Sequence, residues 1–167
     1  MRRALITAAL LSLCWSPCSV AAQSRSCSGP QLGTWRLQSF KTRYLDTGET
    51  TEPFGAHPSG YLSYGPDCRM YAILAEQKRK PPAAIVPTDA EKIELFAGFV
   101  AYAGTYTIDG NTVTHHVDVS WNEAWTGTGQ VRRFRIAGKV LYIESVPAKN
   151  FRDGRLSSSS LVWMKVE

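Results

Sequence analysis

Most of the chain alternates apolar and polar positions with the period of two that is typical of half-buried β-strands. These runs are rich in aromatic and β-branched residues, and turn-forming glycine, proline and aspartate residues separate them. Two of the connections, Asp109-Gly110 and Ala137-Gly138, are short enough to join antiparallel neighbours. The segments predicted as strands are residues 34–46, 51–54, 61–64, 69–75, 104–108, 112–119, 130–136, 139–145 and 161–166.

One segment has helical spacing instead. Thr88 and Glu91 have the spacing of a capping box, in which each side chain bonds the backbone N–H of the other residue. Apolar residues such as Phe96 then recur every three or four positions, and Gly104 provides a stop. The pattern predicts one helix over residues 88–103. Its largely apolar surface predicts that it packs against the rest of the domain.

Many short strands with a single helix predict a mainly β fold, an antiparallel up-and-down barrel of about eight to ten strands. A closed barrel removes the exposed strand edges that an open sheet would leave. A β-sandwich is the alternative, because it has a similar strand pattern. The length of 167 residues and the hydrophobic content of 44% fit one domain with a sizeable core.

The start of the chain has the pattern of a secretory signal peptide. Arg2 and Arg3 form a basic beginning, residues 4–13 are apolar, and small residues permit cleavage after Ala22. The apolar run is shorter than the roughly 20 residues that a membrane-spanning helix needs, so no stable membrane insertion is predicted. A lipid-attachment site at Cys14 is the alternative interpretation. The signal pattern predicts an exported protein, periplasmic or secreted.

The predicted organisation is a signal peptide over residues 1–22, a flexible N-terminal lead over 23–32 and a barrel domain over 33–167. The chain has 19 Lys and Arg against 14 Asp and Glu, and losing two arginines with the leader reduces the net charge from +5 to +3. The one dense basic run, residues 78–80, has the composition of a solvated loop. No nucleic-acid partner is predicted.

Two of the four cysteines lie in the leader, which leaves Cys27 and Cys68 in the mature chain. An exported protein meets an oxidising compartment, where two cysteines can form a disulfide. The alternative is two separate thiols, since sequence alone does not bring them together. No Cys and His spacing resembles a zinc site and no cofactor-binding motif occurs, so neither a metal nor a cofactor is predicted.

Several motifs resemble one known family. The stretch GTWRL at residues 33–37 resembles the glycine-x-tryptophan signature of the lipocalins and the wider calycins. The chain is also similar, over nearly its whole mature length, to the bacterial and fungal lipocalin-like domain family. That resemblance implies a small up-and-down barrel with an interior cavity, and it implies less about the ligand or the activity. The segments that carry it are PFG (53–55), GYLSYGPDCRM (60–70), AYAGTYTIDGNTVTHHV (101–117), QVRRF (130–134) and LVWMKV (161–166).

Two adjacent histidines occupy the middle of a predicted strand, where neighbouring side chains point to opposite faces. His115 lies on a valine face and His116 lies on the other. If the valine face lines the barrel, His115 is either a polar anchor for a ligand or a core histidine, and His116 is exterior. A bulge would exchange the two faces. The valines on the face of His115 are Val113, Val117 and Val119.

Arg132 shares a strand face with Phe134 and is predicted to point into the barrel. An unpaired charge there is costly, so a carboxylate of the protein or of a ligand is expected to pair with it. Further candidates for the wall or the rim of a binding cavity are Tyr61, Tyr102, Trp121 and Trp125.

No catalytic signature occurs: there is no glycine-flanked nucleophilic serine, no phosphate-binding loop and no histidine-glutamate metal motif. The leading hypothesis is a binding protein for a small apolar or amphipathic ligand in the barrel. The rival is a barrel isomerase or cyclase in which His115 is acid or base and Arg132 stabilises negative charge. A structural envelope protein without a cavity is a third possibility. The pattern does not predict an oligomeric state.

Overall fold

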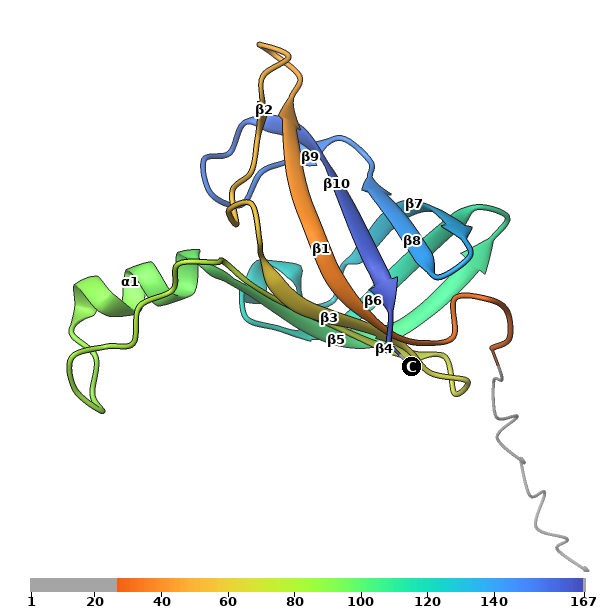
Figure 1. Ribbon diagram of the computed structural model, residues 1–167, viewed down its shortest axis with the longest axis horizontal. Helices are drawn as coiled ribbons and strands as arrows, with labels where there is room; N and C mark the ends of the chain where they lie inside the picture. Colours follow the sequence, from red (N-terminus) through yellow and green to blue (C-terminus); the bar gives the residue numbers. More distant parts are fainter. Residues whose placement is uncertain (1–26, 167) are drawn as a thin grey trace, which may run out of the picture.

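The computed structural model describes residues 27–166, so the predicted signal peptide and residues 23–26 lie outside the described residues. Figure 1 shows strands wrapped around one interior, with a helix on an arm that projects from the barrel. In chain order the elements are β1 (Gly33–Tyr44), β2 (Thr50–Thr51), β3 (Ser59–Tyr64), β4 (Arg69–Ala75), α1 (Asp89–Ala97), β5 (Phe99–Asp109), β6 (Thr112–Ser120), the 3-10 helix η1 (Glu123–Trp125), β7 (Gly129–Ala137), β8 (Val140–Ser145), β9 (Ala148–Lys149) and β10 (Leu156–Lys165).

Within the described residues the strands close into a barrel. Neighbours follow the order β1-β3-β4-β5-β6-β7-β8-β10, and β10 returns to pair with β1. Every pairing is antiparallel. The short strands β2 and β9 lie beside β1 and β10. The predicted antiparallel up-and-down barrel with one α-helix is confirmed, and the sandwich alternative is excluded.

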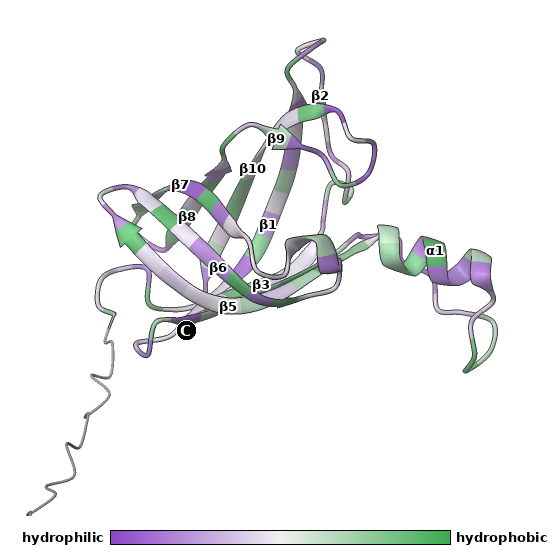
Figure 2. Cartoon of the chain, turned by 180° about the vertical axis from the view of Figure 1, so that it is seen from behind, coloured by the Kyte–Doolittle hydropathy of each residue, from purple (hydrophilic) through white to green (hydrophobic). Residues whose placement is uncertain are grey.

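Strand β1 shows how the alternation of side chains fills the interior. Leu37 and Phe40 are both buried, although strict alternation would place them on opposite faces. The register of β1 against β10 shifts between Leu37 and Ser39. This bulge inserts one residue and returns Phe40 to the interior. Figure 2 shows hydrophobic and hydrophilic residues interspersed along the strands of the barrel.

A second bulge lies where β5 pairs with β6, between Ala103 and Gly104. A Cβ added at Gly104 would overlap the carbonyl oxygen of His116, so this close approach of two backbones requires glycine. Beyond the bulge Val119 faces outward and is 59% exposed. The prediction that Val119 shares the inner face of His115 is therefore wrong, and Gly104 lies within a strand rather than at the end of a helix.

The capping box predicted for the helix is confirmed, because the Thr88 side chain accepts from the Glu91 N–H and the Glu91 carboxylate accepts from the Thr88 N–H. The predicted end at residue 103 is wrong. Helix α1 ends before Gly98, and β5 begins at Phe99. The residues after Gly98 alternate between buried and partly exposed, so tertiary pairing as a strand overrides their helix-like spacing.

The prediction that the helix packs against the domain is also wrong. None of the residues of α1 is buried, and Ile93 is 70% exposed. Figure 1 shows α1 on an arm beyond the ends of β4 and β5. No helix in the described part of the chain is both long enough and apolar enough to span a bilayer.

The last strand is longer than predicted, since β10 begins at Leu156 rather than at residue 161. The stretch LSSSS has the composition of a loop, yet it pairs with β1 from Ser157 onward. Ser157 is buried in the barrel. Small polar side chains therefore occupy positions that a strand would usually fill with large apolar ones.

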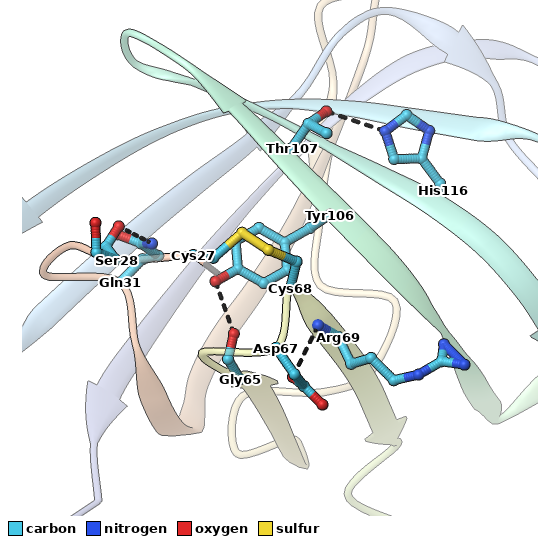
Figure 3. The surroundings of a disulfide bond; sticks show 10 residues. All are labelled: Cys27, Ser28, Gln31, Gly65, Asp67, Cys68, Arg69, Tyr106, Thr107 and His116. Atoms are coloured by element: carbon cyan, nitrogen blue, oxygen red, sulfur yellow. Dashed lines mark hydrogen bonds between the residues drawn. A yellow bond between two sulfur atoms is a disulfide. The ribbon is translucent and has the colours of Figure 1, made fainter. Parts of the chain in front are cut away.

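The chain before β1 is held by a disulfide to the turn between β3 and β4 (Figure 3). The disulfide between Cys27 and Cys68 is present, which confirms that prediction. The Cys27 N–H donates to the Pro66 carbonyl oxygen, and the Tyr106 hydroxyl donates to the Gly65 carbonyl oxygen at 3.0 Å. Cys68 has a φ of 62°, a conformation that turns usually assign to glycine, so its bond to Cys27 explains a cysteine here.

The end of the barrel beside this turn contains a buried tryptophan with a satisfied N–H. Gln31 is buried, and its carbonyl oxygen accepts a hydrogen bond of 2.8 Å from the Trp35 indole. The Lys165 ammonium lies 5.0 Å from the centre of the Trp35 ring. Residues 27–32, which the sequence assigns to a flexible lead, are therefore fixed against the barrel and close it.

Candidate functional site

The interior of the barrel contains a cavity of about 340 Å³ towards its other end. The apolar residues of its wall are Phe40, Phe54, Leu62, Ala72, Leu74, Val100, Ile143, Leu161 and Trp163. The polar and charged residues within the barrel are Thr42, Tyr102, His115, Gln130, Arg132, Ser145, Ser157 and Ser159. The segments near the mouth contribute Pro53, Ala124, Trp125, Ala148, Lys149, Asn150, Phe151 and Arg152.

Small side chains explain why this half of the barrel is hollow. Thr42 on β1 and Ser159 on β10 face each other, with their hydroxyl oxygens 3.4 Å apart. Ala72 on β4 and Ser157 on β10 also line the space. A wall of alanine, serine and threonine cannot fill the interior at normal packing density, so a cavity remains.

His115 on β6 sits in the wall of the cavity, 1% exposed, between Tyr64 of β3 and Tyr102 of β5. The Tyr64 hydroxyl is 2.8 Å from its Nε2, and the Tyr102 hydroxyl is 2.9 Å from its Nδ1. Both ring nitrogens therefore have a partner. Tyr102 comes from β5, which pairs with β6, whereas Tyr64 reaches His115 through the interior from β3, because β4 and β5 separate β3 from β6.

Proton counting favours one arrangement of this cluster. A neutral imidazole donates through one nitrogen and accepts through the other. Tyr64 has no other hydrogen-bond partner among the described residues and does not line the cavity, so its proton is best satisfied by Nε2 of His115. Nδ1 then donates to the Tyr102 oxygen, and the Tyr102 proton remains available to an acceptor in the cavity.

Burial keeps all three groups uncharged near neutral pH. Burial and, second to it, the Arg132 guanidinium lower the pKa of His115 from 6.5 to about 3. Burial raises the pKa of Tyr64 well above 10. Burial also raises the pKa of Tyr102, against the opposing effect of Arg132. The cluster can orient and donate hydrogen bonds but carries no charge.

Arg132 on β7 lines the cavity, as predicted, and is partly buried. Its guanidinium donates to the Val131 carbonyl oxygen at 2.9 Å and to the Gln130 side-chain oxygen at 3.3 Å. No carboxylate among the described residues forms an ion pair with it. The protein carboxylate that the sequence allowed as its partner is therefore not found in this part of the chain.

Aromatic rings surround the mouth of the cavity. Trp125 contacts Tyr102 edge-on, with ring centres 5.5 Å apart, and Trp121 lies 4.9 Å from Trp125. Phe151, from the segment between β9 and β10, lies 5.3 Å from Trp121. Phe96, near the end of α1, lies 6.1 Å from Trp121. Three separate segments thus supply one aromatic rim.

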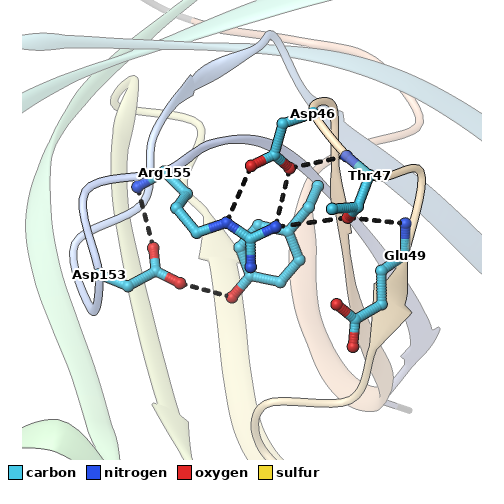
Figure 4. Close-up of polar contacts among 6 residues, drawn as sticks. Asp46, Thr47, Glu49, Asp153 and Arg155 are labelled. Carbon is cyan, nitrogen blue, oxygen red and sulfur yellow. Dashed lines mark hydrogen bonds and ion pairs between the residues drawn. The ribbon is translucent and has the colours of Figure 1, made fainter.

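An exposed polar network joins two turns at this open end (Figure 4). The Arg155 guanidinium donates to both oxygens of Asp46, at 3.1 and 2.8 Å, and lies 3.9 Å from the centre of the Tyr44 ring. The Tyr44 hydroxyl donates to Asp153 at 2.8 Å. Hydrogen bonding by Arg155 lowers the pKa of Asp46. The network ties the turn after β1 to the segment before β10.

The structure places four of the six predicted site residues in the cavity wall, a fifth at its rim and the sixth outside the barrel. His115, Arg132, Tyr102 and Trp125 all line the cavity, and Trp121 contacts Trp125 at its rim. Tyr61 is 47% exposed on the outer face of β3, so its placement in the cavity wall is corrected. The buried residues on this strand are Gly60, Leu62 and Tyr64, because alternation directs Tyr61 outward.

His116 lies on the exterior, where its Nε2 is 3.0 Å from the Thr107 hydroxyl. Asp118, two positions further along the strand, forms an ion pair with Arg69 at 2.8 Å.

No sequence pattern predicted several residues of the site. Phe151 and Arg152 lie in a polar segment with no secondary-structure pattern, and only the closed barrel places them over the mouth. The Arg152 guanidinium donates to the Ala97 carbonyl oxygen at 2.8 Å and lies 3.8 Å from Glu76. Ser157 was not singled out from the sequence because it lies within a run of four serines. Its period-two relation to Ser159 and Leu161 was the available signal.

Comparisons with known proteins agree with this geometry. A family model described as a lipocalin-like domain matches residues 32–166. No curated protein and no solved structure matches the chain significantly.

Proposed function

Because the chain belongs to the lipocalin-like domain family, we propose that it binds a small, largely apolar ligand inside the barrel. The observation that carries the proposal is the cavity of about 340 Å³, which lies at the small end of the usual range for ligand sites. Apolar side chains form much of its wall, and a few polar groups converge at one place. This combination gives both a favourable burial energy and a fixed ligand orientation.

The aromatic rim supports the same function. Trp125 and Phe151 are partly exposed and stand at the mouth, where they can contact a ligand that enters or leaves. Loops that hold binding residues on a rigid scaffold are a common arrangement. The barrel strands supply that scaffold here.

The rival hypothesis of a barrel isomerase or cyclase gains no support from the contacts of His115. Both of its ring nitrogens are engaged by tyrosine hydroxyls, and its pKa of about 3 makes it a weak base at neutral pH. A general base works best with a pKa near the operating pH. The binding function is therefore the one the site favours.

We also propose that the protein is exported. The disulfide between Cys27 and Cys68 supports this, since such bonds persist in oxidising compartments and are rare in the cytosol of mesophiles. The leader over residues 1–22 is the signal that would direct export. N-terminal sequencing of protein from the culture medium and from the periplasm tests it, and an unprocessed chain that stays in the cytosol would contradict it.

Native mass spectrometry of gently purified protein tests ligand binding. We expect a bound species of small mass that is lost on denaturation. Ala72→Phe is expected to fill the cavity. The matched variant is Ala101→Phe, which makes the same change on the neighbouring strand β5, next to the partner of Ala72 and outside the cavity wall. Retention of the bound species by Ala72→Phe would contradict binding in the barrel, and its loss from both variants would indicate a general effect on folding.

A further inference from the structure

We infer that the ligand carries a carboxylate, and that Arg132 and Tyr102 hold this group inside the barrel while the apolar wall holds its tail. The inference rests on the proposed binding function and deepens it by naming the ligand class. It is built from the charges of the wall, the unsatisfied donors in it and their position.

The charges that line the cavity are all positive. The wall contains Arg132, Lys149 and Arg152, and no aspartate or glutamate is among the lining residues that the structure describes. Arg152 is held outside by Glu76 and the Ala97 carbonyl oxygen. Lys149 is exposed at the mouth, where water solvates it. Arg132 is the cation that remains within the barrel.

Arg132 has donors to spare. A guanidinium carries five N–H groups, and its partners here are all neutral: the Val131 and Gln130 oxygens accept from it, and the Tyr102 hydroxyl lies within its reach. Neutral acceptors do not balance its charge, and a partly buried cation without a counter-ion is costly. A carboxylate provides both the opposite charge and two oxygens that match the planar fork of the guanidinium.

Tyr102 supplies a neighbouring donor. Its oxygen accepts from Nδ1 of His115 in the arrangement that satisfies Tyr64, so its own proton is available to an acceptor on a ligand in the cavity. Arg132 is close enough to act on the Tyr102 hydroxyl, which places the two donors side by side. Neutral His115 adds no competing charge to this end of the cavity.

A further donor in the wall is without a partner. The indole N–H of Trp163 is buried and has no acceptor among the described residues, and Trp163 lines the cavity. A ligand that brought only donors, such as an amine, would leave these groups unpaired and would also meet the charge of Arg132. The chemistry of the wall therefore selects an acid with an apolar body.

Isothermal titration calorimetry at pH 7.5 with decanoate and decanamide tests the inference, because the two probes have similar shapes and differ in charge. We expect the native protein to bind decanoate about tenfold or more tightly than decanamide, as a charge-assisted pair would provide. Arg132→Met should remove this preference by weakening decanoate alone. Tyr102→Phe should reduce it by a smaller factor and serves as the second variant if Arg132→Met fails to fold.

The matched control is Arg133→Met, on the outer face of the same strand, which should bind both probes as the native protein does. Equal affinities of decanoate and decanamide for the native protein would overturn the carboxylate inference and leave the binding function standing. An unchanged preference in Arg132→Met would overturn it as well. Binding of neither probe would contradict the binding function itself.

Discussion

The two ends of the barrel are built from the same strands but differ in how completely they are filled. At the closed end Trp35 and Tyr106 are buried, their polar atoms are bonded to backbone oxygens, and a disulfide fixes the covering segment. At the open end small side chains leave a cavity, Arg132 donates to neutral oxygens alone, and the Trp163 indole N–H has no acceptor among the described residues. Stability is concentrated at one end and recognition at the other.

Side-chain size, rather than backbone, produces this difference. Strand β10 contains both kinds of position. Trp163 fills the interior nearer the closed end, while Ser157 leaves space nearer the open end. A well-packed core stabilises a fold, whereas a binding site must keep some of its interior unpacked. Variants that affect stability and variants that affect binding should therefore separate along the barrel axis.

The largest expected effect is on stability at the closed end. Cys27→Ser opens the disulfide, which closes a loop spanning 41 positions in the chain. Loss of this constraint should lower the free energy of unfolding by about 4 kcal/mol. Guanidinium titrations of the native and variant proteins measure the change. Ligand affinity of the folded variant should stay the same, and a parallel loss of affinity would break the separation of the two ends.

His115→Leu should come next, with a loss of about 2–4 kcal/mol in the free energy of unfolding, because two buried tyrosine hydroxyls lose their partner. The same change at His116, which is exposed on the same strand, should alter it by less than about 0.5 kcal/mol. Urea titrations of both variants decide the matter. Equal losses of unfolding free energy in the two variants would mean that the hydrogen bonds of the buried cluster do not stabilise the fold.

Acid should destabilise the protein through His115. Its pKa is about 3 in the folded state and 6.5 in the reference state, so between these values the unfolded chain binds a proton that the folded chain does not. Stability is thus complete above pH 6.5 and falls as the pH is lowered, by about 2 kcal/mol between pH 7 and pH 5. Thermal unfolding of His115→Gln across this range should show a flatter profile. An identical profile would contradict the neutral, buried state.

The smallest effect is expected at the exposed network of the open end. Arg155→Gln removes the contacts to Asp46, yet both side chains are well solvated and exposed ion pairs contribute little. The denaturation midpoint should remain nearly unchanged, and raising the salt concentration should reduce any difference further. A large shift in the midpoint would show that the open end contributes to stability as the closed end does.

The barrel could be predicted from the sequence because alternation, short turns and the GTWRL motif all indicate it, and they depend on local geometry. The helix end was missed because Val100 and Tyr102 fit the period of two of a strand and also continue the helical spacing from Phe96 and Phe99, and only pairing with β4 and β6 decides between the two. Tyr61 was misplaced because aromatic type alone does not reveal a face.

The site itself was predictable in part. His115 and Arg132 followed from strand faces, which hold where the strand is regular. The predicted face of Val119 was wrong because a bulge lies between Val117 and Val119 in the pairing of β6 with β5. The sequence signal for this bulge was a single glycine, Gly104. Phe151 could not be found at all, since its position depends on the closure of β10 against β1.

Confinement of binding to the open half of the barrel can be tested with the tryptophan indole N–H signals in an NMR titration with decanoate. Trp35 reports on the closed end, while Trp125 and Trp163 line the cavity. We expect the signals of Trp125 and Trp163 to shift on binding while that of Trp35 stays in place. Shifts of Trp35 as large as theirs, or of Trp35 alone, would contradict it.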